Sequence, residues 1–394
     1  MLGHLNEWLA LAIRWLHVIA GIAWIGDSFY FMWLDASLKR DASTPEGVKG
    51  ESWSVHGGGF YRVIKFQNAP DAMPETLHWF KWQAYTTWMS GLALLAVVYW
   101  LQAKAFMLGG SVESAGAAVG IGFATVFGGF AVYHLLCKSP LGKQPVALAG
   151  VLLAFAAGVA YVLGDVLSPR AAYIHVGAMV GTWMAGNVAM VIIPNQKKIV
   201  AALLEGKTPD PALGAESKLR STHNNYLTLP VIFVMISNHY PSTFGHEHAW
   251  LVLIGLFALG AFTRVFFNMK NAGRVIGWML PVAGVAYIGL AVITAPKPLP
   301  EVDAGADGVT WAQVEPIIET HCVSCHSATP THHIFKTAPN GVTYDTPQEV
   351  ASKAAMIKAR AVDTATMPLA NETNMTAEER ATLGAWIAAG SPIP

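Results

Sequence analysis

Long apolar runs dominate the first three quarters of the chain. A helix needs roughly 20 mainly apolar residues to span a bilayer. Seven windows approach or exceed this length, at residues 8–34, 80–102, 115–136, 145–167, 171–193, 248–267 and 274–295. An eighth window, about residues 224–240, is shorter and contains Pro230. The pattern therefore predicts a polytopic bundle of seven or eight transmembrane helices.

The positions of the basic residues decide whether the eighth window crosses. If eight helices cross and the N-terminus lies outside, the inner loops and their flanks hold sixteen Lys and Arg residues, against three outside. Cytoplasmic loops carry such an excess. We therefore expect eight spans, with both termini on the outer face and the loops 35–79 and 194–223 inside. In a bacterium this places the protein in the cytoplasmic (inner) membrane, with its C-terminal segment on the periplasmic side.

The pattern changes after residue 295. The Pro-rich stretch 296–308 is typical of a semi-rigid linker. Beyond it, the segments Thr310–Gln313 and Thr376–Glu379 have the sequence of capping boxes, and each precedes a short run with an apolar stripe. We expect an all-α protein: a transmembrane catalytic domain over 1–295, the linker, and a small all-α domain over 309–394.

Composition agrees with a membrane protein. Hydrophobic residues make up 53% of the chain and charged residues only 13%, against about 25% charged in typical soluble proteins. The 25 basic and 25 acidic residues balance. The lipid bilayer is therefore an expected partner, and a nucleic acid is not.

The segment His321–His326 contains the pattern Cys-x-x-Cys-His, which is typical of a covalent c-type haem site. Cys322 and Cys325 would bond the haem vinyl groups, and His326 would ligate the iron. Cys-x-x-Cys alone also occurs in zinc knuckles and dithiol redox pairs. Met367 lies about forty residues after this motif and directly before Pro368, where a small cytochrome c has its distal ligand. Met375 is the rival candidate for that role. We therefore expect a class I-like cytochrome c domain carrying one haem c. Haem attachment in bacteria occurs outside the cytoplasmic membrane, which agrees with the topology.

Several ionisable residues fall inside the predicted spans, where they are functional candidates because burying them in lipid is costly. Arg14, His17 and Asp27 lie on the first span, and His175 lies near the start of the fifth. Under the predicted topology His17 and His175 reach a similar outer level. Two such imidazoles can ligate a haem b, or each can hydrogen-bond a neighbouring helix.

A second polar group lies on the inner side. It includes His56, followed by three glycines, and the segment from Arg220 to Asn225 with His223. Basic, amide and aromatic side chains together suit a planar, polar anion, with a histidine as proton acceptor. The alternative is a basic loop that only fixes orientation in the membrane.

The chain as a whole resembles the bacterial membrane-bound urate oxidases (urate hydroxylases) that carry a fused C-terminal cytochrome c domain. The resemblance rests on WLHVIAGIAWIGDSFYFMWLD (15–35), HGGGFYRV (56–63), RSTHNNYLTLPVIFVMISNHYP (220–241), HCVSCHS (321–327) and MPLANETNMT (367–376). It implies oxidation of urate to 5-hydroxyisourate in purine catabolism. It also implies that electrons pass through haem c to a respiratory acceptor, such as a soluble cytochrome c or a terminal oxidase. The haem ligands of the family correspond to Cys322, Cys325, His326 and Met367.

Candidate catalytic residues in the membrane domain come from the residue pattern. They are His56, His223, Arg14, His17, Asp27 and His175, with the substrate expected near His56 and His223. Two other functions fit parts of the pattern. One is a membrane-anchored cytochrome c that transfers electrons without a substrate of its own, and the other is a membrane oxidoreductase that handles haem.

Overall fold

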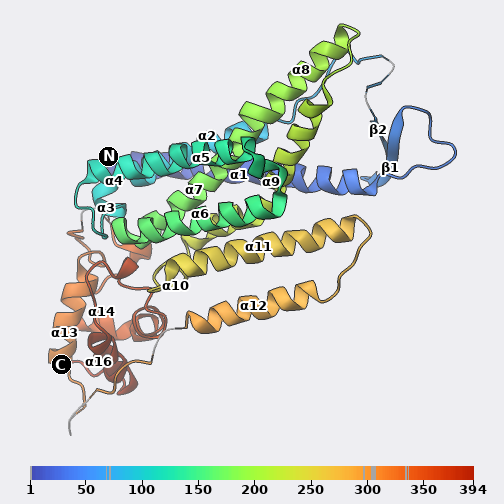
Figure 1. The fold of residues 1–394 in the computed structure, drawn as a ribbon. Helices are drawn as coiled ribbons and strands as arrows, with labels where there is room; N and C mark the ends of the chain where they lie inside the picture. Colours follow the sequence, from blue (N-terminus) through green and yellow to red (C-terminus); the bar gives the residue numbers. More distant parts are fainter. Residues whose placement is uncertain are drawn as a thin grey trace.

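The computed structural model describes residues 2–67, 69–70, 72–295, 298–302, 308–332, 335 and 337–394. Figure 1 shows a bundle of long helices with a β-hairpin at one end and a small helical unit at the other. The bundle helices are α1 (Leu2–Ser37), α2 (Trp82–Leu95), α4 (Ala115–Phe123), α5 (Gly129–Lys138), α6 (Pro145–Val166), α7 (Pro169–Gly186), α8 (Ile193–Leu204), α9 (Pro211–Ser237), α11 (Ala249–Asn271) and α12 (Met279–Ile293). Short helices α3 (Ala103–Phe106) and α10 (Pro241–Phe244) connect them at the end where the chain begins.

Five helices of the described chain are long and apolar enough to cross a membrane. They are Trp8–Ser37, Ala115–Lys138, Pro145–Val166, Pro169–Leu204 and Ala249–Asn271. The remaining predicted windows are also helical, but α12 is shorter and α9 begins with a polar half. The doubtful eighth window lies within α9, which continues through Pro230 as one helix.

Three π-helical turns interrupt the bundle helices. They are η1 (Ala96–Trp100) after α2, η2 (Ala124–Gly128) between α4 and α5, and η4 (Asn187–Ile192) between α7 and α8. Such turns occur frequently at functional sites, because the extra residue rotates side chains away from the regular helical face.

Helix α7 is the central element of the bundle, and most of its side chains are buried. Its neighbours pack against it at glycines. A Cβ atom on Gly122 of α4 would collide with His175, and one on Gly129 of α5 would collide with Met179. Only glycine permits helices to approach so closely at these points.

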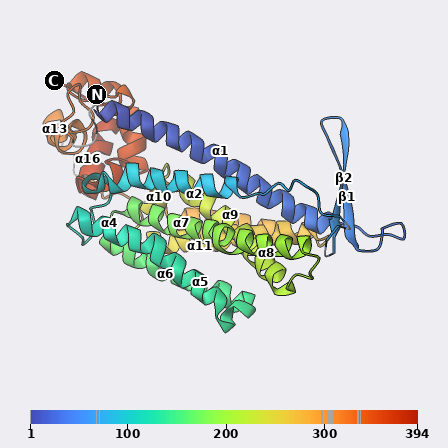
Figure 2. The same ribbon diagram turned by 90° about the horizontal axis from the view of Figure 1, so that it is seen from above.

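The segment after α1 contains β-structure, which the all-α expectation missed. Strands β1 (Val48–His56) and β2 (Gly59–Phe66) pair antiparallel. Gly57 and Gly58 form the connection with φ of +58° and +79°, as a two-residue type I′ turn requires. The first two glycines after His56 are therefore a hairpin turn and Gly59 begins β2. The hairpin projects beyond the bundle (Figures 1 and 2).

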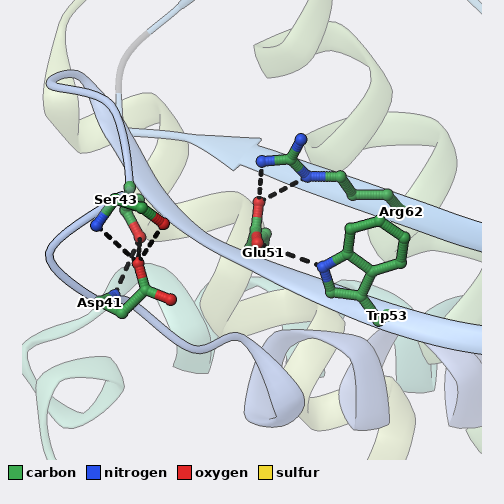
Figure 3. Close-up of polar contacts among 6 residues, drawn as sticks. Asp41, Ser43, Glu51, Trp53 and Arg62 are labelled. Atoms are coloured by element: carbon green, nitrogen blue, oxygen red, sulfur yellow. Dashed lines mark hydrogen bonds and ion pairs between the residues drawn. The ribbon is translucent and has the colours of Figure 1, made fainter.

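Polar contacts hold the base of the hairpin (Figure 3). Arg62 of β2 forms a salt bridge with Glu51 of β1, and the Trp53 indole donates to the same carboxylate. The turn that precedes β1 is closed by Asp41, which accepts from the backbone and hydroxyl of Ser43.

The C-terminal unit is a small helical domain. It contains η5 (Glu319–Val323), η6 (Pro339–Gly341), η7 (Lys358–Asp363), η8 (Leu369–Asn371), α13 (Trp311–Ile318), α14 (Pro347–Ser352), α15 (Ala354–Ile357) and α16 (Ala377–Ala388). The capping boxes predicted at Thr310 and Thr376 are confirmed. Val314, Leu383 and Trp386 are completely buried in its core. The predicted linker is only partly described, because residues 296, 297 and 303–307 lie outside the described residues. The unit lies at the end of the bundle where the chain begins, opposite the hairpin (Figures 1 and 2).

Candidate functional site

A buried polar cluster joins α5, η4 and α9 inside the bundle, and we call it the Arg220 cluster. Its members are Tyr133, Asn187, Arg220, His223 and Asn224. Arg220 is 1% exposed, and Tyr133 and Asn187 are completely buried. Residues 220, 223 and 224 share one side of α9 because positions three and four apart on a helix are neighbours. The short segment Arg220–Asn224 therefore delivers three polar groups to one place.

Hydrogen bonds fix the orientation of each group in the Arg220 cluster. Arg220 can only donate, so the oxygen of Asn187, 3.2 Å from Nη1, must face it. The Asn187 amide nitrogen therefore donates to the Tyr133 hydroxyl and to the Asn224 oxygen, each at 2.8 Å. The amide nitrogen of Asn224 in turn donates to the carbonyl of Met184.

The hydroxyl of Tyr133 also contacts His223. Its oxygen accepts from Asn187, and Nδ1 of His223 lies 2.9 Å away, so the hydroxyl donates to this nitrogen when the ring proton of His223 is on Nε2. The Tyr133 ring also stacks on Trp183 of α7, with centroids 4.9 Å apart and planes 6° from parallel. The guanidinium carbon of Arg220 lies over the Tyr133 ring, 5.4 Å from its centroid.

Two polar atoms in this region are buried without a hydrogen-bond partner. They are Nη2 of Arg220 and Nδ1 of His134. Within the described part of the chain, no carboxylate lies at ion-pair distance from Arg220. A buried charge without a partner is costly, so this site is suited to an anion that would complete it.

A second buried cluster lies on the other side of α9. The side-chain oxygen of Asn225 accepts from Arg264 at 3.0 Å and from Asn268 at 2.9 Å. The Arg264 guanidinium lies 3.9 Å from the ring centroid of Phe29. Asn225 also reaches Ser28 of α1. This cluster ties α9 to α1 and α11, and Nη2 of Arg264, like Nη2 of Arg220, is buried without a partner.

The two histidines predicted to face each other have other partners. Nδ1 of His17 contacts the carbonyl of Thr87 and the hydroxyl of Ser90 on α2. In His175, Nδ1 bonds the Ala171 carbonyl and Nε2 accepts from the Trp100 indole at 3.1 Å. Both nitrogens of His175 are therefore occupied by protein groups, and this arrangement does not fit a haem b between the helices.

The remaining sequence-predicted residues lie apart from the Arg220 cluster. Arg14 is exposed on α1, and Asp27 is half-buried with one carboxylate oxygen unpartnered. His56 is exposed at the hairpin turn, and no described contact connects it to His223. The structure therefore does not bring His56 and His223 into one site, because residues 48–66 form a projecting hairpin instead of a loop folded onto the bundle.

The C-terminal unit contains the candidate haem ligands, and hydrogen bonds hold two of them. Nδ1 of His326 lies 3.0 Å from the Val342 carbonyl, so this nitrogen carries the proton and Nε2 is left for a metal, as in metal-binding histidines generally. Met367 is 37% exposed, whereas its rival Met375 is 3% exposed in the core. Arg380 holds the Met367 segment by donating to the Met367 carbonyl and to Asn371. These residues fit a covalent haem with His326 and Met367 as ligands.

The two cysteines do not have the character of a dithiol redox pair. Burial raises the pKa of Cys322 to about 12 and also raises the pKa of Cys325. Reactive Cys-x-x-Cys thiols have lowered pKa values. Zinc is not supported either, since no group of three or more His, Cys, Asp or Glu side chains in the described residues is arranged to hold a metal.

Several members of the buried clusters were not predicted from the sequence. Tyr133, Asn187, Trp183 and Asn268 were missed because each is a single neutral residue within or beside an apolar window. Arg264 was counted only as part of the inner basic excess. The available signal was Arg264, because an arginine within an apolar window, here 248–267, is unusual.

Comparison with known proteins gives one match. The model of a family described as "Urate oxidase N-terminal" matches residues 3–295. A search of the curated proteins and of the solved structures found no match. The matched range ends where the bundle ends, so it includes the Arg220 cluster and leaves out the C-terminal unit.

Proposed function

The chain belongs to the urate oxidase N-terminal family, and we propose that its helix bundle oxidises urate to 5-hydroxyisourate and passes the electrons to a haem c in the C-terminal unit. The reaction takes urate and water to 5-hydroxyisourate with release of two electrons and two protons. It therefore requires a site for a planar anion, a proton acceptor and an electron acceptor.

The observation that carries the proposal is the incomplete bonding of Arg220. Its buried Nη2 atom is without a partner and no described carboxylate neutralises it. Urate is an anion with several carbonyl and N–H groups, so it can accept from this guanidinium. Arginine suits such planar partners because its donors form a rigid fork. We place the substrate beside Arg220, where His134 Nδ1 offers an acceptor for an N–H group.

Protons released in the reaction have acceptors close to Arg220. The Tyr133 hydroxyl and Nδ1 of His223 are 2.9 Å apart, so His223 with its ring proton on Nε2 can take up a proton through that hydroxyl. The cluster is buried, which excludes bulk water and strengthens each of these interactions. Arg220 therefore binds and orients the anion, and His223 acts as general base, as the sequence suggested for that residue.

The C-terminal unit would hold the haem through Cys322 and Cys325, with His326 and Met367 as axial ligands. When bound, this group supplies a one-electron acceptor. The hydrogen bond to Val342 fixes the His326 ring, and Arg380 fixes the backbone of Met367. A soluble cytochrome c or a terminal oxidase of the respiratory chain would then remove each electron. We assign the protein to the bacterial inner membrane, with this unit on the periplasmic side.

Anaerobic addition of urate to the purified, oxidised protein tests the proposal. We expect the absorption bands of ferrous haem c to appear without oxygen, and no hydrogen peroxide to form during aerobic turnover. The double variant Cys322→Ala/Cys325→Ala should bind urate but should not turn it over. Hydrogen peroxide formed in proportion to urate consumed, or full turnover by the double variant, would contradict the proposal.

A further inference from the structure

Glu216 and Arg220 lie four positions apart on α9, and the ion pair that this spacing favours is not formed. Residues at positions i and i+4 of a helix are neighbours, and a glutamate that precedes a basic residue has the favourable order. None of the ion pairs in the described part of the chain joins these two side chains. Arg220 donates to Asn187 instead, and its Nη2 atom is left without a partner. The Glu216 carboxylate is therefore held elsewhere.

Asn195 of α8 holds the Glu216 carboxylate. The amide nitrogen of Asn195 donates to Oε2 of Glu216 at 3.0 Å, and it also contacts the Leu213 carbonyl at 3.4 Å. An ionised carboxylate can only accept, so the amide of Asn195 must turn its nitrogen toward it. Asn195 is buried, and its bond to Glu216 crosses from one helix to the next. The packing of α8 against α9 therefore sets where the carboxylate lies.

Each of the two charges is bonded to a neutral asparagine instead of to the other charge. Glu216 accepts from Asn195, and Arg220 donates to Asn187. Arg220 is almost completely buried, so its charge is poorly solvated and a carboxylate within reach would pair with it. A neutral donor satisfies Glu216 without bringing its carboxylate to the guanidinium. The positive charge of Arg220 therefore stays available to another anion.

We propose that Asn195 is a positioning residue that holds the Glu216 carboxylate away from Arg220 and so keeps the guanidinium free for the anionic substrate. The inference rests on the proposed function and deepens it. Without the Asn195 donor, Glu216 turns to Arg220 and occupies the donor that urate needs. Urate must then displace an internal carboxylate, and its apparent affinity falls by the fraction of molecules in which the guanidinium is already paired.

The position of Glu216 on α9 fits this role. Glu216 lies one helical turn closer than Arg220 to the start of α9, and α9 starts at the end of the bundle opposite the C-terminal unit (Figure 1). The charges of Glu216 and Arg220 act with opposite sign on the same two side chains of α5, His134 and Cys137. Both charges therefore belong to one polar neighbourhood, and an anion that enters from the start of α9 meets Glu216 before Arg220.

The affinity of the purified protein for urate, measured by isothermal titration calorimetry, tests the role of Asn195. Asn195→Leu removes the donor at similar volume and should weaken binding by roughly three- to tenfold. Asn195→Asp, which keeps the shape but lacks the donor, is the second variant and should also weaken it. Adding Glu216→Gln to Asn195→Leu should restore the affinity, because an uncharged side chain does not compete for Arg220.

The matched control for this rescue is Asn195→Leu/Glu205→Gln. Glu205 lies directly after α8, is exposed and is paired with Lys207, so its neutralisation should leave the affinity at the weakened value. Unchanged affinity in both Asn195 variants would overturn the inference. So would weakened affinity that Glu216→Gln does not restore, or that Glu205→Gln restores equally, since either result would show a merely structural or general electrostatic effect.

A thermal-stability cycle tests the same contact without urate. The melting temperatures of Glu216→Gln, Arg220→Gln and the double variant are compared in the wild-type and Asn195→Leu backgrounds. The two substitutions should be close to additive with Asn195 present and coupled without it, because only then do the two charges pair. Equal coupling in both backgrounds would overturn the inference. If the wild-type protein does not bind urate, the proposed function fails, and the cycle still decides whether Asn195 separates Glu216 from Arg220.

Discussion

His326 and Val342 are joined by a hydrogen bond from the ring Nδ1 to the backbone carbonyl, 3.0 Å long. This contact selects the tautomer of His326 and leaves Nε2 as the ring nitrogen available to a metal.

Replacement of Met367 tests the assignment of the distal ligand. Met367→Ala should abolish the thioether-to-iron absorption band and lower the reduction potential, because methionine ligation raises it. Met375→Leu is the control. Met375 is 3% exposed, so this conservative core change should keep the band and cost less than about 1.5 kcal/mol of stability. Survival of the band in Met367→Ala would transfer the assignment to Met375.

Replacement of Arg220 tests the position of the anion site. Hydrogen bonds to charged groups contribute about 1.5–3 kcal/mol, so Arg220→Gln should weaken urate binding roughly ten- to hundredfold. Arg264→Gln is a matched change, because Arg264 is also buried and also has an unpartnered Nη2. Isothermal titration calorimetry measures the affinity of each variant for urate. Loss of affinity in Arg264→Gln alone would move the substrate to the Asn225 side of α9.

His56→Ala distinguishes the hairpin from the Arg220 cluster as the place of catalysis. His56 is exposed in the hairpin turn, and His223 is bonded to Tyr133. We expect His56→Ala to keep the rate at which urate reduces the haem and His223→Gln to lower it. The comparison is made by stopped-flow spectroscopy at saturating urate. A large effect of His56→Ala with none of His223→Gln would restore the hairpin as the site.

Cysteine labelling tests the predicted topology. Thr208→Cys lies in the exposed α8–α9 connection, and Ala389→Cys lies at the exposed end of α16. In intact cells, a membrane-impermeant maleimide should modify position 389 and should modify position 208 only after the cytoplasmic membrane is opened. Labelling of position 208 in intact cells would invert the orientation and the side from which urate enters.

The capping carboxylate Glu379 should make the C-terminal unit sensitive to acid. Burial acts to raise the pKa of Glu379, but hydrogen bonds from the Thr376 backbone and from His321 outweigh it, and the net pKa is lowered. A carboxyl with a lowered folded-state pKa stabilises the fold above the unfolded value of about 4.3, and this stability is lost as the pH falls through the folded value. Thermal unfolding is followed by the haem Soret band. Below the unfolded-state pKa, the melting temperature should fall more steeply with decreasing pH in wild type than in Glu379→Gln. Parallel curves for the two proteins would exclude this contribution.

The sequence predicted helices better than it predicted their contacts. Each apolar window fell on helix because hydrophobic length is a local property, and Thr310 and Thr376 marked the starts of helices by capping chemistry. The loop predicted over 194–223 was instead largely helical, since it contains α8 and the polar first half of α9. The hairpin was missed because the segment 35–79 was expected to be an inner loop, although consecutive glycines can supply the two positive φ values that a tight turn between strands requires.

The candidate site could be predicted only in part, because neighbouring helices are chosen by packing. Arg220, His223 and Asn224 were found as a polar segment. Their partners Tyr133 and Asn187 lie on other helices and stand out in no local pattern. The sequence left open whether His17 and His175 ligate a haem b or each hydrogen-bond a neighbouring helix, and their rings contact Ser90 of α2 and Trp100 of η1, respectively.

The glycine contacts around α7 limit where this protein can be made more heat-resistant. Filling of interior space is a common route to stabilised variants, but Gly122 and Gly129 have a histidine and a methionine where any added methyl group would go. An alanine at Gly122 would push His175 away from Trp100, so a gain in packing would disturb the hydrogen bond between them. Libraries for thermostable variants should therefore leave the α7 faces of α4 and α5 constant. They should vary the outward faces of α6 and α12, where Val162 and Val285 are 55% and 70% exposed.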